Sequence, residues 1–221
     1  MARPPLSCVA LLIIVAAATG CSVDAEAEIT RLGGTVKRVE SESGRITVEI
    51  NLKRTRVDDR TLAYVKSFPE AASLDLSETK IGDAGLHHLR GLSKLRRLYL
   101  SGTEVTDAGV AEVAGIKSLS SLSISRTPIG DDGIRNLAQL PELRVLNLSG
   151  TAVTDDGIAL LIRENQTLAS LLLDNTGITE ASMPELAKLK GLRKLSLPDS
   201  LASSKTQEIK KSVPALEIIE R

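Results

Sequence analysis

Apolar residues recur along most of this chain in one short pattern that returns every 24 residues. The clearest copy runs from Leu95 to Val113, and its apolar positions are Leu95, Leu98, Leu100, Val105, Val110 and Val113. The same pattern begins again at Leu119 and at Leu143. Self-similarity with a period of about 20 to 50 residues predicts a solenoid, in which each repeat buries its apolar side against its neighbours.

Each copy begins with two apolar residues at alternate positions, which predicts a short strand with one buried face. These pairs are Ile50/Leu52, Leu74/Leu76, Leu98/Leu100, Leu122/Ile124, Leu146/Leu148, Leu171/Leu173 and Leu195/Leu197, with a truncated last copy at Leu216/Ile218. All steps are 24 residues except the step of 25 from Leu146 to Leu171 and the last step of 21. We expect the extra residue within residues 162–167.

The second half of each copy predicts a short helix. Apolar residues three positions apart, such as Val110 and Val113, give one buried helical face. The residues expected at the helix N-caps are Thr106, Thr154, Thr179, Gly82 and Gly130. Strands in a sheet lie about 4.8 Å apart, whereas packed helices need about 8 to 10 Å. The stack is therefore expected to curve, with parallel strands on its concave face and helices on its convex face.

The repeat pattern reads LxxLxLxxTx, then Val or Ile, then Thr or Gly, and then DxG. This pattern resembles the leucine-rich repeat family, in particular its 24-residue bacterial strand–helix subclass. Thr stands where the family usually has Asn. The resemblance covers residues 46–221 and implies an α/β solenoid of horseshoe shape. No segment resembles an F-box, so the sequence gives no support for a ubiquitin-ligase adaptor.

Both ends of the solenoid carry segments that we interpret as caps, because an open apolar end must be covered. Residues 22–34 predict a short helix that ends at Gly33-Gly34, and residues 35–52 predict a hairpin with its turn at 42–44. At the other end, residues 204–207 resemble a capping box that opens a helix. Pro214 stops this helix, and residues 216–219 form a last strand.

The first 20 residues are typical of an export signal, because Arg3 precedes the uncharged run Val9–Ala18, which is too short to span a bilayer. Residues 18–21 (ATGC) resemble the lipobox of bacterial lipoproteins, in which the cysteine receives the lipid. Ordinary cleavage after Ala16-x-Ala18 is the alternative. We predict a lipid on Cys21, the only cysteine left after cleavage, and hence an exported lipoprotein of a bacterial envelope. A secreted or periplasmic protein is the alternative.

The expected organisation is therefore a signal peptide over residues 1–20 and a lipid-anchor cysteine, short helix and first cap strand over 21–45. The repeats occupy 46–198, and the C-terminal cap occupies 199–221. Aromatic residues make up only 1% of the chain, which predicts an aliphatic core. The net charge is zero, and neither a basic stripe nor stacking aromatics are present, so we expect no nucleic-acid partner.

Several columns of identical residues suggest chemistry but have structural explanations. One acidic column could bind calcium, but each carboxylate is expected in a first helical turn, where the helix dipole favours it: Asp59, Asp83, Asp107, Asp131, Asp155 and Glu180. The threonine column is expected to hydrogen-bond the turn backbone and the adjacent repeat: Thr55, Thr79, Thr103, Thr127, Thr151 and Thr176. The glycine column gives no phosphate loop and is interpreted as close packing between turns: Gly85, Gly109, Gly133 and Gly157.

No catalytic constellation appears in the sequence. His87 and His88 are adjacent, so they cannot form a metal-binding pair at helical spacing, and we interpret them as surface residues. No motif places either histidine beside a serine and a carboxylate. We expect no enzyme activity, no cofactor and no metal.

The concave face is the remaining candidate site, and it predicts a protein or peptide partner. Arg97 and Tyr99 are of the types that dominate binding energies, and Val145 and Leu172 are apolar where water is expected. The predicted partner-binding residues are Asp75, Arg97, Tyr99, Ser123, Val145, Asn147, Leu172 and Asp174. We expect a monomer; the alternative is a structural spacer without a discrete ligand.

Overall fold

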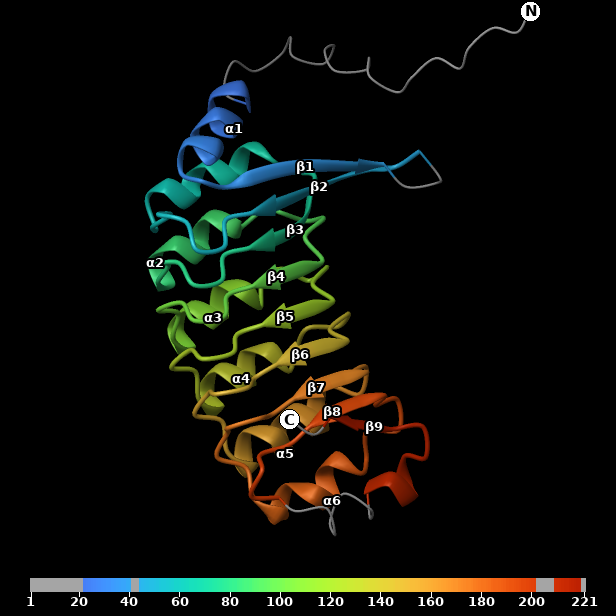
Figure 1. The fold of residues 1–221 in the computed structure, drawn as a ribbon. Helices are drawn as coiled ribbons and strands as arrows, with labels where there is room; N and C mark the ends of the chain where they lie inside the picture. Colours follow the sequence, from blue (N-terminus) through green and yellow to red (C-terminus); the bar gives the residue numbers. More distant parts are fainter. Residues whose placement is uncertain (1–21, 41–43, 202–208, 220–221) are drawn as a thin grey trace, which may run out of the picture.

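A computed structural model describes residues 22–40, 44–201 and 209–219. Figure 1 shows one long stack with strands along one side and helices along the other. The strands of the described residues belong to one nine-stranded sheet in sequence order, β1 to β9. The first pair, β1 and β2, is antiparallel, and each later pair is parallel. The predicted α/β solenoid is confirmed.

Each strand from β2 to β8 contains the first residue of a predicted apolar pair, and the second residue of the pair follows the strand's end. The strands are β1 Thr35–Glu40, β2 Ile46–Asn51, β3 Ala71–Asp75, β4 Arg97–Tyr99, β5 Ser121–Ser123, β6 Val145–Asn147, β7 Ser170–Leu172, β8 Lys194–Ser196 and β9 Glu217–Ile219. From Ile50 to Leu195 the inward residues pair in register along one column. The last step was wrong, because Leu195 pairs with Ile218 and not with Leu216. A shift of two residues keeps the same side chains facing inward, so the apolar pattern alone could not detect it.

The helical segments lie on the opposite side: η1 Thr61–Ser67, α2 Asp83–Leu86, η2 His87–Leu89, α3 Asp107–Val113, α4 Asp131–Leu137, α5 Asp155–Glu164, η3 Glu180–Ser182 and α6 Met183–Leu186. All five predicted N-caps are confirmed. Thr106 and Thr179 accept hydrogen bonds from the backbone two residues on, whereas Thr154 does not. Helix α5 is longer than α3 and α4, which accommodates the 25-residue step.

One continuous core runs the length of the stack and is almost wholly aliphatic, with Phe68 its only aromatic member among the described residues. Each fully buried Leu, Ile or Val contributes about 1.5 to 3 kcal/mol relative to an exposed one. The same positions recur in every repeat, so this stabilisation is spread along the chain.

The N-terminal end is closed by helix α1, Ser22–Arg31, which packs on β1 and η1 (Figure 1). Gly33 adopts a φ of 92° and donates to the Thr30 carbonyl, while Gly34 donates to the Ile29 carbonyl, each at 2.9 Å. This pair of bonds is the Schellman motif, which explains why the helix ends here. The predicted helix and hairpin are confirmed.

At the C-terminal end, Ile209 and Val213 are buried, and β9 completes the sheet. The predicted capping box at 204–207 lies outside the described residues, as do the hairpin residues 41–43 and the leader with Cys21. Within the described part of the chain, no helix has the length and apolar character needed to cross a bilayer.

Candidate interaction face on the sheet

The solvent-facing side of the sheet places the predicted partner-binding residues in two rows. Residues at the first strand position pair in the order Arg97, Ser121, Val145, Ser170, Lys194. Residues at the last strand position pair in the order Asp75, Tyr99, Ser123, Asn147, Leu172, Ser196, Ile219. Asp174 lies two residues beyond the second row. All eight predicted residues therefore share one face.

A polar hollow of about 690 Å³ brings together four of the eight residues: Asp75, Tyr99, Asn147 and Asp174. The rest of its lining includes Lys53, Glu78 and Arg126. Arg97, Ser123, Val145 and Leu172 lie outside this lining. The structure thus divides the predicted strip into a polar hollow and a neighbouring set of residues.

Most polar groups of the hollow already have partners. The carboxylates or amide oxygens of Asp75 and Asn147 accept hydrogen bonds from the backbone N–H two residues on, at 2.9 and 3.0 Å. The Asp174 carboxylate accepts from Ser149 Oγ at 3.0 Å and from Ser196 Oγ at 2.6 Å. The hydroxyl of Tyr99 has no hydrogen-bond partner among the described residues and is available to a ligand.

The turn after each strand uses a left-handed backbone, and several repeats place a large side chain there. Arg54, Glu78, Arg126 and Asn175 have φ values of 51 to 58°. The equivalent residues Gly102 and Gly150 have φ values of 67 and 71°. A non-glycine residue in this region costs about 1 kcal/mol or more. The repeats that carry Arg or Glu therefore accept a strain that glycine would avoid.

Two of these left-handed residues, Glu78 and Arg126, place charges in the lining of the hollow, and Arg54 lies against Glu78. Arg54 Nε lies 2.5 Å from Glu78 Oε2, and an Arg126 terminal nitrogen lies 3.5 Å from Glu78 Oε1. The hydrogen bond from Arg54 holds the pKa of the Glu78 carboxyl below its ordinary value, although partial burial opposes it. Exposed pairs of this kind add about 0 to 1 kcal/mol to stability, so their contribution to the fold is small.

Two of the predicted residues outside the hollow are also engaged by neighbours. Arg97 donates to Glu49 Oε1 on β2 at 2.6 Å, a pairing between residues 48 positions apart. The hydroxyls of Ser123 and Ser101 lie 2.8 Å apart and share a hydrogen bond. A partner that uses the guanidinium of Arg97 must displace Glu49 or accept both groups together.

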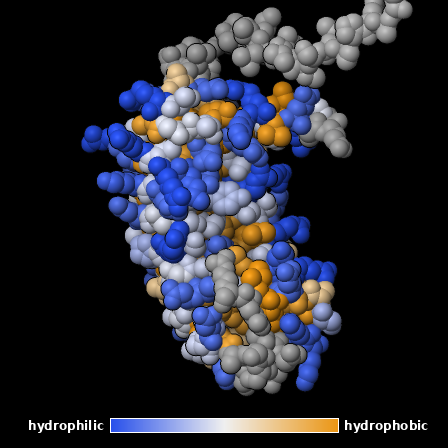
Figure 2. Space-filling view, viewed as in Figure 1, coloured by the Kyte–Doolittle hydropathy of each residue, from blue (hydrophilic) through white to orange (hydrophobic). Residues whose placement is uncertain are grey.

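Apolar side chains occupy the same face further along the stack. Val145 is 37% exposed, and Leu172 and Ile219 are half-buried. Figure 2 shows apolar surface gathered over the lower part of the stack, where β7 to β9 lie. Between Leu172 and Ile219, Ser196 is fully buried although its position faces outward. The alternation of the strand pattern alone would expose Ser196. It also did not identify Ile219, because the register of β9 is set by the irregular last step.

The acidic column binds the next repeat. Oδ1 of Asp59, Asp83, Asp107, Asp131 and Asp155 accepts the backbone N–H of the next helix N-cap at 2.7 to 2.9 Å. The predicted first-turn placement is confirmed for all members except Asp59, which lies just before η1. Within the described residues, no three His, Cys, Asp or Glu side chains are grouped to hold a metal ion.

Comparisons with known proteins agree with this architecture. A family model described as Leucine Rich repeat matches residues 73–87, 91–114, 116–138 and 139–161. Internalin C2 from Listeria monocytogenes has a similar fold, with a TM-score of 0.60 and 24% sequence identity over 88% of this chain and 80% of that one. A comparison with curated protein sequences gives no match. The family model thus identifies leucine-rich repeats within residues 73–161, and the same solenoid continues on both sides of them.

Proposed function

We propose that this protein is a non-catalytic module that binds a protein partner on the exposed face of its sheet. Leucine-rich repeat folds are in general interaction scaffolds, and the finer assignment rests on the hollow that joins Asp75, Tyr99, Asn147 and Asp174. The left-handed Glu78 and Arg126 in its lining support the proposal, because strained backbone is retained where the side chain is needed.

The partner surface implied by this face has two parts. The hollow offers the free Tyr99 hydroxyl and a lining of both charges, so it suits a polar segment. Val145 and Leu172 offer partly exposed apolar surface beside the hollow, because Val145 lies on the same strand as Asn147 and Leu172 pairs with Asn147 from β7. This surface suits an apolar anchor. Interfaces commonly combine a few aromatic or apolar anchors with a polar surround.

We also propose that a lipid on Cys21 tethers this module to a membrane, with the leader removed at residue 20. The support is the sequence ATGC at residues 18–21. Metabolic labelling with a fatty-acid analogue should label the native chain and leave Cys21→Ala unlabelled. Labelling of both chains, or of neither, would refute the lipid anchor while leaving the proposed binding face untouched.

The binding proposal is tested by affinity capture with crosslinking from envelope extract of the source organism. The native full-length chain is compared with a Tyr99→Ser, Leu172→Ser variant. The matched control is Tyr64→Ser, Leu160→Ser, because Tyr64 is 37% exposed and Leu160 is half-buried like Leu172, but both lie on the helical side. Loss of a partner by the first variant alone supports the proposal. Equal capture by all three, or no specific partner, would refute it and favour a spacer.

A further inference from the structure

One edge of the solenoid carries an excess of basic residues, although the chain as a whole has no net charge. We call this edge the basic edge. It consists of the loops that lead from each helix into the next strand, which are residues 68–70, 90–96, 114–120, 138–144, 165–169 and 187–193. These loops contain two acidic residues, Glu70 and Glu142, against eight basic ones: Arg90, Lys94, Arg96, Lys117, Arg144, Lys188, Lys190 and Arg193. The first helical turns on the opposite edge carry the acidic column.

Part of this positive charge is not neutralised by neighbours. Arg90, Lys94 and Arg96 pair with Glu112, Glu70 and Glu142. Lys117, Arg144 and Arg193 make no ion pair among the described residues. A row of one charge sign along a surface attracts ligands of the opposite sign even when the net charge is zero.

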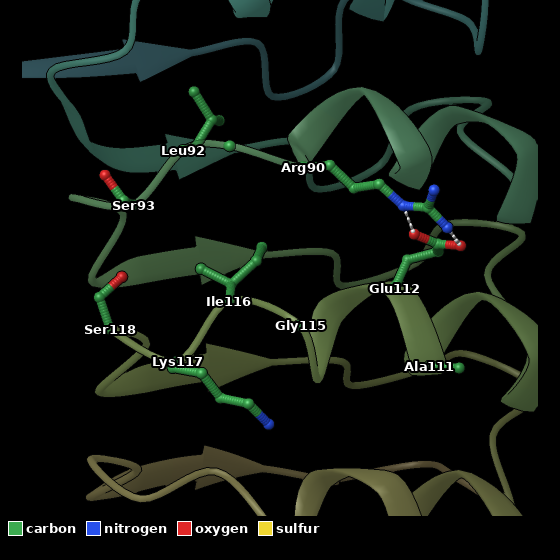
Figure 3. Close-up of a pocket in the computed structure, with 10 residues that line it drawn as sticks. Arg90, Leu92, Ser93, Ala111, Glu112, Gly115, Ile116, Lys117 and Ser118 are labelled. Atoms are coloured by element: carbon green, nitrogen blue, oxygen red, sulfur yellow. Dashed lines mark hydrogen bonds and ion pairs between the residues drawn. The ribbon is translucent and has the colours of Figure 1, made fainter.

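A second hollow of about 690 Å³ opens in the basic edge between the loops of two neighbouring repeats. Figure 3 shows the Arg90–Glu112 ion pair on one side of it and Ser93 and Ser118 on the other. The side chains of Leu92 and Ile116 belong to its lining. The volume is within the range of about 300 to 1,000 Å³ that is typical of ligand-binding clefts.

Two glycines lie in the lining of this hollow. Gly91 and Gly115 occupy one repeat position, and the other repeats place Ser67, Gln139, Glu164 and Lys188 there. The core residues that follow the glycines, Leu92 and Ile116, are 3% and 6% exposed, close to the 5% of Phe68 after Ser67. The hollow therefore lies over buried apolar residues, at a place where two neighbouring repeats add no side chain to fill it.

We propose that the basic edge is a second interaction surface, which takes an acidic segment of a protein partner. One apolar side chain of that segment enters the hollow against Leu92 and Ile116. Its flanking carboxylates lie beside the unpaired Lys117 and the guanidinium of Arg90. Charge complementarity argues for an acidic occupant, and the short apolar floor, two residues wide, argues for a single side chain. This surface lies away from the exposed face of the sheet and does not depend on the function proposed for that face.

The test measures binding of two fluorescent peptides to the full-length chain by anisotropy at low salt. One peptide is rich in Glu and Asp with a single central Leu, and the other has Ser in place of that Leu. We expect the Leu peptide to bind about tenfold more tightly, because burial of a Leu side chain is worth about that factor or more. Binding of both should weaken as salt rises.

Three variants locate the site. Lys117→Glu should weaken both peptides about tenfold, whereas Arg135→Glu, the same charge change on α4, should weaken neither. Gly115→Gln places in the hollow the side chain that Gln139 provides in another repeat, and it should remove the advantage of the Leu peptide. Its β-carbon would lie 3.1 Å from the Glu112 carbonyl oxygen, which requires only a small local shift. Gly191→Gln makes the same change on the same edge but outside the hollow.

The outcomes separate the proposal from its competitors. Loss of the Leu advantage in Gly115→Gln but not in Gly191→Gln, with weaker binding in Lys117→Glu, supports the acidic segment. Equal affinity of the two peptides, equal behaviour of all variants, or no binding overturns it. Binding to phosphatidylglycerol vesicles without binding to either peptide also overturns it and would assign the basic edge to a lipid surface.

Discussion

The carboxylate of Asp83 occupies the space that a side chain at Gly109 would need. A β-carbon at position 109 would lie 2.9 Å from Asp83 Cγ and 3.1 Å from Asp83 Cα, and closer still to Oδ1. The same carboxylate bonds Thr106 N at 2.7 Å and Thr106 Oγ1 at 2.6 Å, so it cannot easily move. The relationship recurs between Asp59 and Gly85, Asp107 and Gly133, and Asp131 and Gly157.

This relationship predicts that Gly109→Ala destabilises the protein, although helix propensity alone predicts the opposite. Alanine in a helix interior is favoured over glycine by about 1 kcal/mol. Overpacking against a fixed group costs about 1 to 3 kcal/mol. We therefore expect a net loss of about 1 to 2 kcal/mol in urea unfolding. Gly191→Ala, where the β-carbon would lie 3.7 Å from the nearest atom, should be neutral or stabilising.

A double-mutant cycle identifies the cause. Asp83→Ala removes Oδ1 and should itself destabilise the protein, because it leaves the Thr106 N–H without its partner. In the Asp83→Ala background, Gly109→Ala should leave the free energy of unfolding unchanged or raise it. The same penalty for Gly109→Ala in both backgrounds would show that the carboxylate is not the obstacle.

Much of the fold could be predicted from the sequence because one local rule repeats. The inward pairs such as Leu98/Leu100 and the N-caps Thr106 and Thr179 are decided within a few residues, and the period then sets every strand in register. The coupling of Asp83 to Gly109 was not predicted, since both columns were visible but the contact crosses 26 positions between repeats. The column of threonines was predicted to bond its turn, which is confirmed, whereas no bond from these hydroxyls to the adjacent repeat is found among the described residues.

The candidate site was predicted less completely, because its details depend on three-dimensional neighbours. The alternation of strand residues placed Tyr99 and Leu172 on the exposed face, but it could not reveal that Glu49 engages Arg97 or that Ser196 is covered. Composition gave a net charge of zero, which concealed the excess of basic residues on one edge. That excess appears only when residue positions are assigned to the loops at the ends of the helices.

Thr127→Val should lower the free energy of unfolding more than Thr103→Val does. Both hydroxyls are buried and donate to the carbonyl three residues earlier, at 2.5 and 2.7 Å. The Leu100 carbonyl also receives the Thr103 N–H at 3.3 Å, whereas the Ile124 carbonyl has no second partner among the described residues. A buried carbonyl left unpaired costs about 1 to 3 kcal/mol, so we expect that loss at Thr127 and about 1 kcal/mol or less at Thr103. Urea midpoints of the two variants measure the difference, and equal losses would contradict it.

Asp155 should contribute to stability at neutral pH and lose that contribution in acid. Burial acts to raise the pKa of this carboxyl, but hydrogen bonds from Ser182 and Thr179 outweigh it and leave the pKa below its ordinary value. Because the folded-state pKa lies below the unfolded-state value of about 3.9, the stabilisation is present above that pH. It is lost as the pH falls through the folded-state pKa.

Asp155→Asn should therefore destabilise the protein by about 1 to 2 kcal/mol at pH 7 through weakened hydrogen bonds, and by less below about pH 4. The matched control is Asp156→Asn, since Asp156 lies in the same first turn but makes no side-chain hydrogen bond among the described residues. Thermal melts across pH 3 to 7 measure both. If the melting temperatures of the native protein and of Asp155→Asn changed with pH in parallel, the prediction would be contradicted.

His88 should make the protein less stable as the pH falls from 7 to 5. The prediction of a surface residue holds for His87, but His88 is half-buried and its Nδ1 has no hydrogen-bond partner. Burial, then the neighbouring His87 and Lys66, lower the pKa of His88 below its ordinary value. The folded protein therefore prefers the neutral ring, and stability is lost as the pH falls from the unfolded-state pKa of about 6.5 through the folded-state value.

In His88→Phe the melting temperature should fall less between pH 7 and pH 5 than in the native protein. The difference should be at most a few degrees, since the group is partly screened by solvent. His87→Gln should reduce the slope without removing it, because burial of His88 remains. An unchanged slope in His88→Phe would assign the pH dependence to other groups.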